Sequence, residues 1–424
     1  MKNKATSVRR SVRAAVLTLT ALLVPGVCAA AQPPDDFVPR HTALGEAYAD
    51  YFLLGNVVSG PSDLGAGLAG ALLKEHFNVV TMENAMKPDH LTASGGGYRF
   101  DAADSLARGA AAAGFALHGH TLVWHSQSPA WLNKRDSATP LTRAEAKANL
   151  AQYIQEVAAH FRGRVISWDV VNEAFYSDGA QIGADWRTGL RTDARPGGWD
   201  EPSFWYQAYA NGADADKGES GADYLYDAFV LARRADPGAK LFYNDYNDDI
   251  PSKVWSITSM IKELNAQYAR EYPDDPRQLI EGVGMQSHYY SPDGDYPTRV
   301  QHVEDAIKAY IEAGVDIAIS ELDICATKKD RAASPEDRLF TPERAARQAE
   351  TYARLFALYK QYAAHIDRVT LWGLTDACSW RSDRSPLLWA GDGTEKAALS
   401  AALDPEGYLR WLGFSVADIP PPEK

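Results

Sequence analysis

Short apolar or β-branched runs alternate with longer stretches rich in Ala, Leu and charged residues along nearly the whole chain. This alternation is typical of parallel strands that are joined by crossover helices. Eight such runs occur, at residues 52–59, 77–83, 116–124, 165–172, 240–245, 282–288, 316–321 and 368–374. Eight strand and helix units predict an α/β fold, specifically a (β/α)8 TIM barrel.

The stretches between the runs are compatible with helices, which we expect at residues 103–113, 143–160 and 342–362 among others. The last of these carries a start signal, because Thr341 can cap the helix and Pro342 follows at its first position. No linker rich in Ser, Gly or Pro interrupts residues 41–414, and no repeat of solenoid period is present. Residues 32–424 are therefore predicted to form a single domain, a length that barrels with insertions reach.

The N-terminus has the pattern of an export signal. Five basic residues and no acidic ones accompany an apolar run at 14–27 and three alanines at 29–31. Residues 1–31 are therefore predicted to be a cleaved signal peptide, which would make the protein secreted or periplasmic. Arg9-Arg10 leaves twin-arginine export open, and Cys28 is expected to leave with the signal. No later segment approaches the roughly twenty apolar residues of a membrane span, so no membrane partner is expected.

The charge balance makes one class of partner unfavourable. Loss of the five basic residues of the signal lowers Lys plus Arg from 43 to 38 against 56 Asp plus Glu, a net charge of −18. Such a chain would repel a nucleic acid but not a neutral polymer. Two cysteines remain, Cys325 and Cys378, too few for a scaffold built on disulfides. Since both follow neighbouring strands of an exported protein, a single Cys325–Cys378 disulfide is left open.

Polar and aromatic side chains gather where the predicted strands end. They are Glu83, Asn84, Lys87, His118, His120, Trp124, His125, Gln127, Asp169, Asn172, Glu173, Asn244, Asp245, Gln286, His288, Glu321, Asp323, Trp372 and Trp380. One such residue would be interpreted as a loop cap or a surface charge, but so many at seven strand ends predict a functional site. In barrels of this kind the active site is built at the carboxyl ends of the strands.

Two glutamates in this set have a special placement. Glu173 follows the fourth run in the segment 168–173, and Glu321 ends the seventh run in the segment 319–323. The fourth and seventh strands of a closed barrel face each other across its mouth. Two carboxyl groups that flank a cleft can cleave a glycosidic bond, because one protonates the leaving oxygen while the other attacks or activates water.

These residues resemble glycoside hydrolase family 10, the xylanases, over about residues 55–411. The motifs that carry the resemblance lie at residues 77–87, 119–125, 168–174, 243–247, 286–289, 320–324 and 371–376. The resemblance implies that residues 32–424 are the catalytic barrel of a retaining endo-1,4-β-xylanase that acts on xylan and xylo-oligosaccharides. It implies Glu173 as the acid/base, Glu321 as the nucleophile, and a monomer that uses no metal or cofactor.

The resemblance also implies sugar-binding roles for a larger set of residues at the strand ends. They are Glu83, Asn84, Lys87, His120, Trp124, Gln127, Asn172, Gln286, Trp372 and Trp380. The flat faces of the three tryptophans suit the axial C–H face of a pyranose ring. Asn172 is placed to bind the 2-hydroxyl group of the sugar, and His288 is expected to hydrogen-bond Glu321.

A retaining mechanism sets conditions on the two carboxyl groups. They should lie about 5 Å apart, which leaves no room for water between them. Glu173 must hold a proton near neutrality, so its pKa should be raised. We expect this shift from the apolar and aromatic walls of the cleft together with the charge of Glu321.

Three features depart from the usual pattern of the family. Ser320 stands where Thr is common but keeps the hydroxyl group, and a cysteine pair after the seventh and eighth strands is not a general feature. The segment 178–221 is longer than in compact members. Its aromatic residues either extend the cleft or pack within the segment, and both interpretations stay open; they are Trp199, Phe204, Trp205 and Tyr206.

Three other functions compete with this interpretation. His118-Gly119-His120 resembles the paired histidines of metal-dependent amidohydrolase barrels, since alternate residues of a strand point to one side. That motif falls on the third strand, however, and no Lys ends the fourth strand to bridge two metals. A sugar-binding barrel without catalysis is disfavoured because both carboxylates are present. A cellulase or aryl-β-glucan hydrolase on the same barrel is the strongest alternative.

Overall fold

The structure is a computed structural model that describes residues 37–195, 200–291, 296–328 and 334–415. The predicted signal peptide, residues 1–31, lies outside the described residues, as does Trp199. None of the helices in the described ranges is long and apolar enough to cross a membrane.

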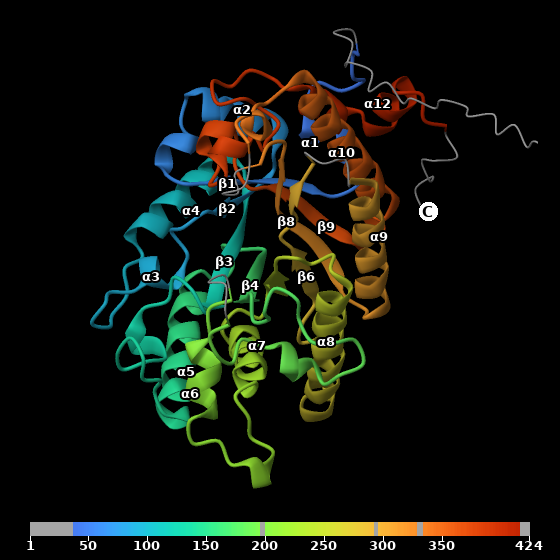
Figure 1. Ribbon diagram of the computed structural model, residues 1–424. Helices are drawn as coiled ribbons and strands as arrows, with labels where there is room; N and C mark the ends of the chain where they lie inside the picture. The colour runs from blue at the N-terminus through green and yellow to red at the C-terminus, as the bar shows by residue number, and fades with distance from the viewer. Residues whose placement is uncertain (1–36, 196–199, 292–295, 329–333, 416–424) are drawn as a thin grey trace, which may run out of the picture.

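Eight parallel strands close into a barrel, which confirms the predicted fold (Figure 1). They are β1 Leu53–Val58, β2 Val79–Met82, β3 Ala116–Trp124, β4 Ser167–Asn172, β5 Lys240–Asp245, β6 Gly282–Met285, β8 Asp316–Cys325 and β9 Ile366–Leu371. Each strand pairs in parallel with its neighbours in chain order, with β8 following β6. The ring closes where Leu53 of β1 pairs with Arg368 of β9.

Helices form a layer around the strands (Figure 1). They are α1 Leu44–Ala47, α2 Leu68–His76, α3 Pro88–Leu91, α4 Asp101–Ala113, α5 Arg143–His160, α6 Phe204–Ala210, α7 Asp223–Ala235, α8 Pro251–Glu271, α9 Tyr296–Glu312, α10 Pro342–Gln361, α11 Ala397–Leu403 and α12 Pro405–Trp411. Thr341 accepts a hydrogen bond from the Arg344 amide and Pro342 opens α10, as the start signal predicts. Because helices cover the outside of the sheet and side chains fill the inside, the strands are buried on both faces and appear in the sequence as continuous apolar runs.

The third and fourth strands show how closely the helical layer and the sheet pack. Trp168 of β4 is fully buried and donates from Nε1 to Asp236 Oδ2 at 3.2 Å, at the end of α7. A Cβ atom on Gly119 of β3 would lie 2.2 Å from the Trp168 ring. Only glycine therefore fits beside the indole, because other residues would collide with it.

Several strand boundaries differ from the prediction, and two of these differences affect residues at the strand ends. The run at residues 282–288 breaks after Met285, because Ser287 adopts the left-handed conformation (φ 59°) and its amide donates to Asp248 Oδ2 at 2.8 Å. The residues that follow form a short separate strand, β7 His288–Tyr290. Its pairing with β8, where His288 lies opposite Asp323, accompanies the extension of β8 beyond Glu321 to Cys325.

Candidate active site

Glu173 lies directly after the last residue of β4, in a strained conformation. Its φ is 56°, a left-handed value that a residue with a side chain rarely adopts, and its amide donates to the Asn244 carbonyl at 2.9 Å. The carboxylate accepts hydrogen bonds from Gln286 Nε2 at 2.9 Å and from Trp124 Nε1 at 3.0 Å. Backbone strain of this kind persists where the surroundings fix it, and it is common at functional sites.

Glu321 lies within β8, and its carboxylate is held from two sides. Asn244 Nδ2 donates to Oε1 at 2.8 Å, and His288 Nε2 lies 3.3 Å from Oε2. The contact with His288 is the one expected from the sequence. The Glu321 side chain is buried, so its charge requires these partners.

Side-chain amides connect the two carboxylates. Asn244 Nδ2 also donates to Asn172 Oδ1 at 3.0 Å, and Gln286 Nε2 donates to the same oxygen at 3.2 Å. A continuous set of contacts therefore runs from Glu173 through Gln286, Asn172 and Asn244 to Glu321. The structure thus brings both predicted glutamates, Asn172 and Gln286 into one network.

Asn244 is a member of this network to which the sequence analysis gave no role of its own. Its orientation is fixed because the Ser320 hydroxyl donates to Asn244 Oδ1 at 2.6 Å, which turns Nδ2 toward Glu321. The hydroxyl that Ser320 keeps in place of Thr therefore has a clear contact. The signal that could have found Asn244 is its position at the end of β5, between the strands that carry the two glutamates.

His288 places a positive charge beside the nucleophile candidate. Burial opposes this charge, but the carboxylates of Asp323 and Glu321 outweigh it and raise the pKa of His288 to about 9. His288 Nδ1 lies 2.9 Å from Asp323 Oδ2, the oxygen that also accepts from Trp380 Nε1 at 3.0 Å. Near neutral pH the imidazolium can donate to both carboxylates, which orients the Glu321 side chain.

The pKa of Glu173 is raised, in the expected direction, and both expected causes, burial and the charge of Glu321, contribute to it. Burial of the carboxyl group is the largest, followed by the charge of Asp245. The hydrogen bond from Gln286 and the charge of Arg191 lower the pKa, and the charge of Glu321 is a smaller raising contribution. The sequence analysis therefore identified burial and the charge of Glu321 but missed the charge of Asp245, which raises the pKa of Glu173 more than Glu321 does.

A second group of predicted residues lies together around Lys87. Its Nζ donates to Asn84 Oδ1 at 3.1 Å and to Gln127 Oε1 at 2.9 Å, and it lies 5.2 Å from the Trp124 ring centroid. Glu83 accepts a hydrogen bond from the Ser59 hydroxyl. Burial lowers the pKa of Lys87, which the charges of Glu321, Glu83 and Glu173 oppose. Lys87 is therefore close enough to Glu173 and Glu321 for the charges of these two glutamates to affect its pKa.

The predicted tryptophan platforms differ in exposure. Trp380 is 54% exposed and lies edge-on to His288, with ring centroids 5.1 Å apart. Trp372 is only 7% exposed and lies edge-on to His120 at 5.4 Å. Trp380 is thus largely exposed beside His288, although the Arg381 guanidinium lies 4.5 Å from its ring centroid, whereas Trp372 presents little surface.

The paired histidines of β3 point to one side, as their alternation predicts, and both contact Asp169. Asp169 Oδ2 lies 3.0 Å from His118 Nε2 and 2.9 Å from His120 Nδ1. His118 also contacts the Ser167 hydroxyl and Arg368 Nη2. Among the described residues, no group of three or more His, Cys, Asp or Glu side chains is arranged to hold a metal ion.

The segment 178–221 packs mainly on itself and on its neighbouring helices where it is described. Trp205 is buried, and Lys134 Nζ lies 4.5 Å from the Phe204 ring centroid. Two of its residues reach the site: Trp205 lines a small space together with Trp124 and Glu173, and Arg191 donates from Nε to the Glu173 carbonyl at 2.9 Å. No strand-end position or periodicity marks Arg191 in the sequence.

The two cysteines are unpaired in the structure. Cys325 is buried, and its Sγ accepts from Arg381 Nη1 at 3.5 Å, while Cys378 is exposed. Burial raises the pKa of the Cys325 thiol to about 12. The Cys325–Cys378 disulfide that the sequence left open is therefore not formed in the structure.

Comparisons with known proteins agree with this geometry. The sequence model of Glycosyl hydrolase family 10 matches residues 43–405. An endo-1,4-beta-xylanase A of Thermotoga neapolitana is 36% identical over 382 residues, which cover 88% of this chain and 31% of that protein. A beta-1,4-xylanase of Dictyoglomus thermophilum is 33% identical over 338 residues, which cover 80% of this chain and 82% of that protein. The chain spans about a third of the length of the Thermotoga relatives that it matches.

Solved structures give the same result. A xylanase of glycoside hydrolase family 10 from termite gut, which contains a bacterial Ig-like domain, has a TM-score of 0.73 at 33% identity. That match covers 88% of this chain and 80% of the other. A variant protein solved in complex with xylotriose has a TM-score of 0.70 at 30% identity and covers 86% of this chain and 100% of the other.

The charge on His288 generates a test in folding stability. The pKa of His288 in the folded state, about 9, lies above the ordinary value of 6.5. The charged His288 therefore contributes fully to the free energy of unfolding below about pH 6.5, and this contribution is lost as the pH rises through 9. We expect the difference in unfolding free energy between wild type and H288Q to fall by on the order of 3 kcal/mol from pH 6 to pH 10. Urea titrations at several pH values measure this. H365Q, at an exposed histidine, is the control, and a pH-independent difference for H288Q would contradict the charge assignment.

Proposed function

The chain belongs to glycosyl hydrolase family 10, and we propose that it is a retaining endo-1,4-β-xylanase with Glu173 as acid/base and Glu321 as nucleophile. One observation carries the assignment of roles. The two carboxylates share one amide network, yet Glu173 has a raised pKa whereas Glu321 lies against the His288 cation. A raised pKa suits an acid, and a carboxylate stabilised by a cation suits a nucleophile.

In the first step, Glu321 attacks the anomeric carbon while Glu173 gives its proton to the departing glycosidic oxygen. The C–O bond to the leaving sugar breaks as the ester bond to Glu321 forms. Asn244 and His288, which donate to the two oxygens of Glu321, orient it for this attack. Trp124 Nε1 and Gln286 Nε2 hold the acid/base in place.

In the second step, Glu173 takes a proton from water, which attacks the anomeric carbon and releases Glu321. The formation of the ester removes the negative charge of Glu321, one of the charges that raise the pKa of Glu173. Glu173 therefore becomes a stronger acid after it has delivered its proton and is left as the carboxylate that the second step needs. Two displacements at one carbon retain the β configuration.

Sugar binding is proposed for the polar groups around Lys87 and for the exposed face of Trp380. Asn172 Oδ1 is occupied by two donors. Its Nδ2 has only a long contact with Glu173 Oε1, at 3.5 Å, and is the group proposed to meet a 2-hydroxyl. Binding of xylo-oligosaccharides is supported by family relatives solved with xylotriose and xylotetraose. Residues 1–31 are proposed to direct export, which suits an enzyme whose substrate is an insoluble polymer.

Product analysis on glucuronoxylan, arabinoxylan and soluble cellulose tests the substrate. We expect xylan to be cut internally to short oligomers and cellulose to be barely attacked, because the inner sites should leave little room for the hydroxymethyl group of glucose. Oligomer size profiles over time distinguish internal from terminal cleavage. Comparable rates on cellulose would contradict the substrate assignment but leave the two-carboxylate mechanism standing, and would favour the cellulase alternative.

Substrates with different leaving groups separate the two glutamates. E321A should lose nearly all activity on every substrate because the nucleophile is gone. E173A should keep a fast first step on dinitrophenyl β-xylobioside, whose leaving group needs no proton, but lose about 10²- to 10⁴-fold on xylan.

The second step of E173A lacks its base, so a glycosyl ester should accumulate and appear in the intact mass. Azide needs no deprotonation and should restore turnover with a β-xylobiosyl azide product. An α-azide, or an equal loss on both substrates, would mean that Glu173 is not the acid/base.

A further inference from the structure

Arg191 is a buried cation in the segment 178–221. Its side chain is 1% exposed, which is unfavourable for a charge unless hydrogen bonds satisfy it. The guanidinium donates from Nε to the Glu173 carbonyl at 2.9 Å, from Nη1 to the Glu201 carbonyl at 3.1 Å and from Nη2 to the Tyr246 hydroxyl at 2.6 Å. Asp200 Oδ1, its nearest carboxylate oxygen, lies 3.7 Å from Nη1. The Arg191 guanidinium therefore donates its hydrogen bonds to uncharged oxygens, one of which is the backbone carbonyl of the acid/base Glu173.

Arg191 also holds the turn that presents Glu173. Its backbone amide donates to the Ala174 carbonyl at 3.1 Å, next to the Glu173 carbonyl that its side chain binds. Two successive carbonyls after β4 are therefore fixed by one residue. Because Glu173 has a left-handed φ of 56°, this turn would relax without such contacts, and the carboxylate would move with it.

The charges that face Glu173 come from several elements. The positive ones are Arg191, Lys253 of α8 and Lys87, and the negative ones are Asp245 of β5 and Glu321 of β8. His125 and the Tyr246 hydroxyl complete the surroundings, and burial, followed by the charges of Arg191 and Lys253, keeps the pKa of His125 well below its usual range.

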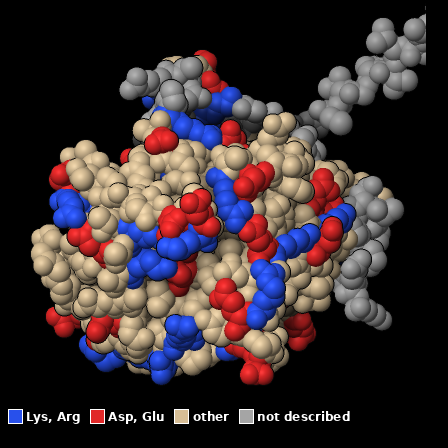
Figure 2. Space-filling model, turned by 90° about the horizontal axis from the view of Figure 1, so that it is seen from below, with Lys and Arg blue, Asp and Glu red and all other residues tan. Residues whose placement is uncertain are grey.

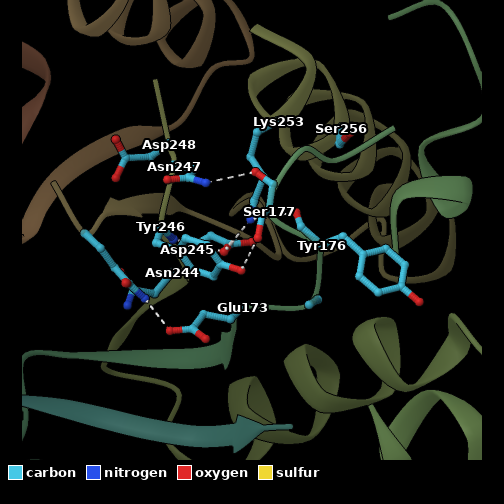
Figure 3. Close-up of polar contacts among 12 residues, drawn as sticks. Glu173, Tyr176, Ser177, Asn244, Asp245, Tyr246, Asn247, Asp248, Lys253 and Ser256 are labelled. Atoms are coloured by element: carbon cyan, nitrogen blue, oxygen red, sulfur yellow. Dashed lines mark hydrogen bonds and ion pairs between the residues drawn. The ribbon is translucent and has the colours of Figure 1, made fainter. Parts of the chain in front are cut away.

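Lys253 and Asp245 form a separate pair within this set. Lys253 Nζ lies 2.8 Å from Asp245 Oδ1 and also donates to the Tyr176 carbonyl at 3.0 Å (Figure 3). Both side chains are fully buried. Lys253 is thus engaged with Asp245, whereas Arg191 is the cation that directly contacts the Glu173 backbone.

We propose that Arg191 is a positioning residue for Glu173. Arg191 holds the turn that presents the acid/base, and its positive charge offsets the negative charge of Asp245. The proposal rests on the proposed role of Glu173. It gives the segment 178–221 a part in catalysis through Arg191. Burial and Asp245 raise the pKa of Glu173 whereas Arg191 lowers it, so removal of Arg191 should raise the pKa further.

R191M tests this in the pH dependence of kcat on xylobiosides with a poor leaving group. The basic limb, which follows deprotonation of Glu173, should move to higher pH by about one unit, the size expected for one nearby charge. The displaced turn should also lower kcat by about tenfold with little change in KM. R195M is the matched control, because Arg195 lies in the same segment but is partly exposed, pairs with Asp178 and stacks on Tyr176. Its pH profile should equal that of wild type.

Two further variants distinguish the effect of the Arg191 charge from the effect of its hydrogen bonds to the turn, and both from general damage to the fold. R191K keeps the charge but loses the three-way contact, so kcat should fall while the basic limb stays near its wild-type position. In an E173A background, R191M should cause no further loss on dinitrophenyl xylobioside with azide, because Arg191 acts through Glu173. Circular dichroism and melting curves establish that each variant is folded, and R191K carries the test if R191M is not.

An unshifted limb in folded R191M would overturn the proposal, as would an R191K that shifts like R191M or equals wild type in kcat. An additive loss in the E173A background would do the same. Failure of the proposed function has a different signature, since wild type itself would then not cleave xylan, or E173A would lose activity equally on both kinds of leaving group.

Discussion

Closure of the sheet is the constraint on which the site depends. The parallel pairing of β6 with β8, in which Gly282 lies opposite Asp316, and of β1 with β9 turns eight strands into a ring. All carboxyl ends then meet at one rim, so that side chains from distant parts of the chain converge. Glu173 after β4 and Glu321 in β8 become members of one hydrogen-bonded set only because the ring is closed. The amide of Asn244, on the strand next to β4, then reaches both Asn172 and Glu321.

Several residues at the carboxyl-terminal rim of the barrel have strained backbone conformations, which contacts with neighbouring side chains stabilise. Left-handed backbone occurs at Glu173, which belongs to the network, at Ser287, next to Gln286, and at Gln127, which accepts a hydrogen bond from Lys87. Such conformations cost of order 1–3 kcal/mol each and persist because their neighbours fix them. Asp248 bonds the Ser287 amide, and Arg191 bonds the Glu173 carbonyl. On the face of the molecule in Figure 2, by contrast, acidic and basic side chains are interspersed.

The sequence predicted the barrel because strands buried on both faces leave uninterrupted apolar runs, and eight of these were visible. It predicted the two glutamates because strand ends are where such a barrel places chemistry. The break at Ser287 was missed, since it depends on a hydrogen bond to Asp248 from another part of the chain. The contribution of Asp245 to the raised pKa of Glu173 was missed, because relative distances within the cleft cannot be read from strand order. Arg191 was missed for the same reason.

Trapping the covalent intermediate on wild-type enzyme tests the central claim most directly. A 2-deoxy-2-fluoro β-xylobioside with a dinitrophenyl leaving group should react once and stay bound, because the fluorine slows both steps and the leaving group restores only the first. Peptide mapping by mass spectrometry should then find one xylobiosyl residue on Glu321. A label on Glu173, or a protein that turns the reagent over without a covalent adduct, would contradict the assignment of nucleophile and acid/base.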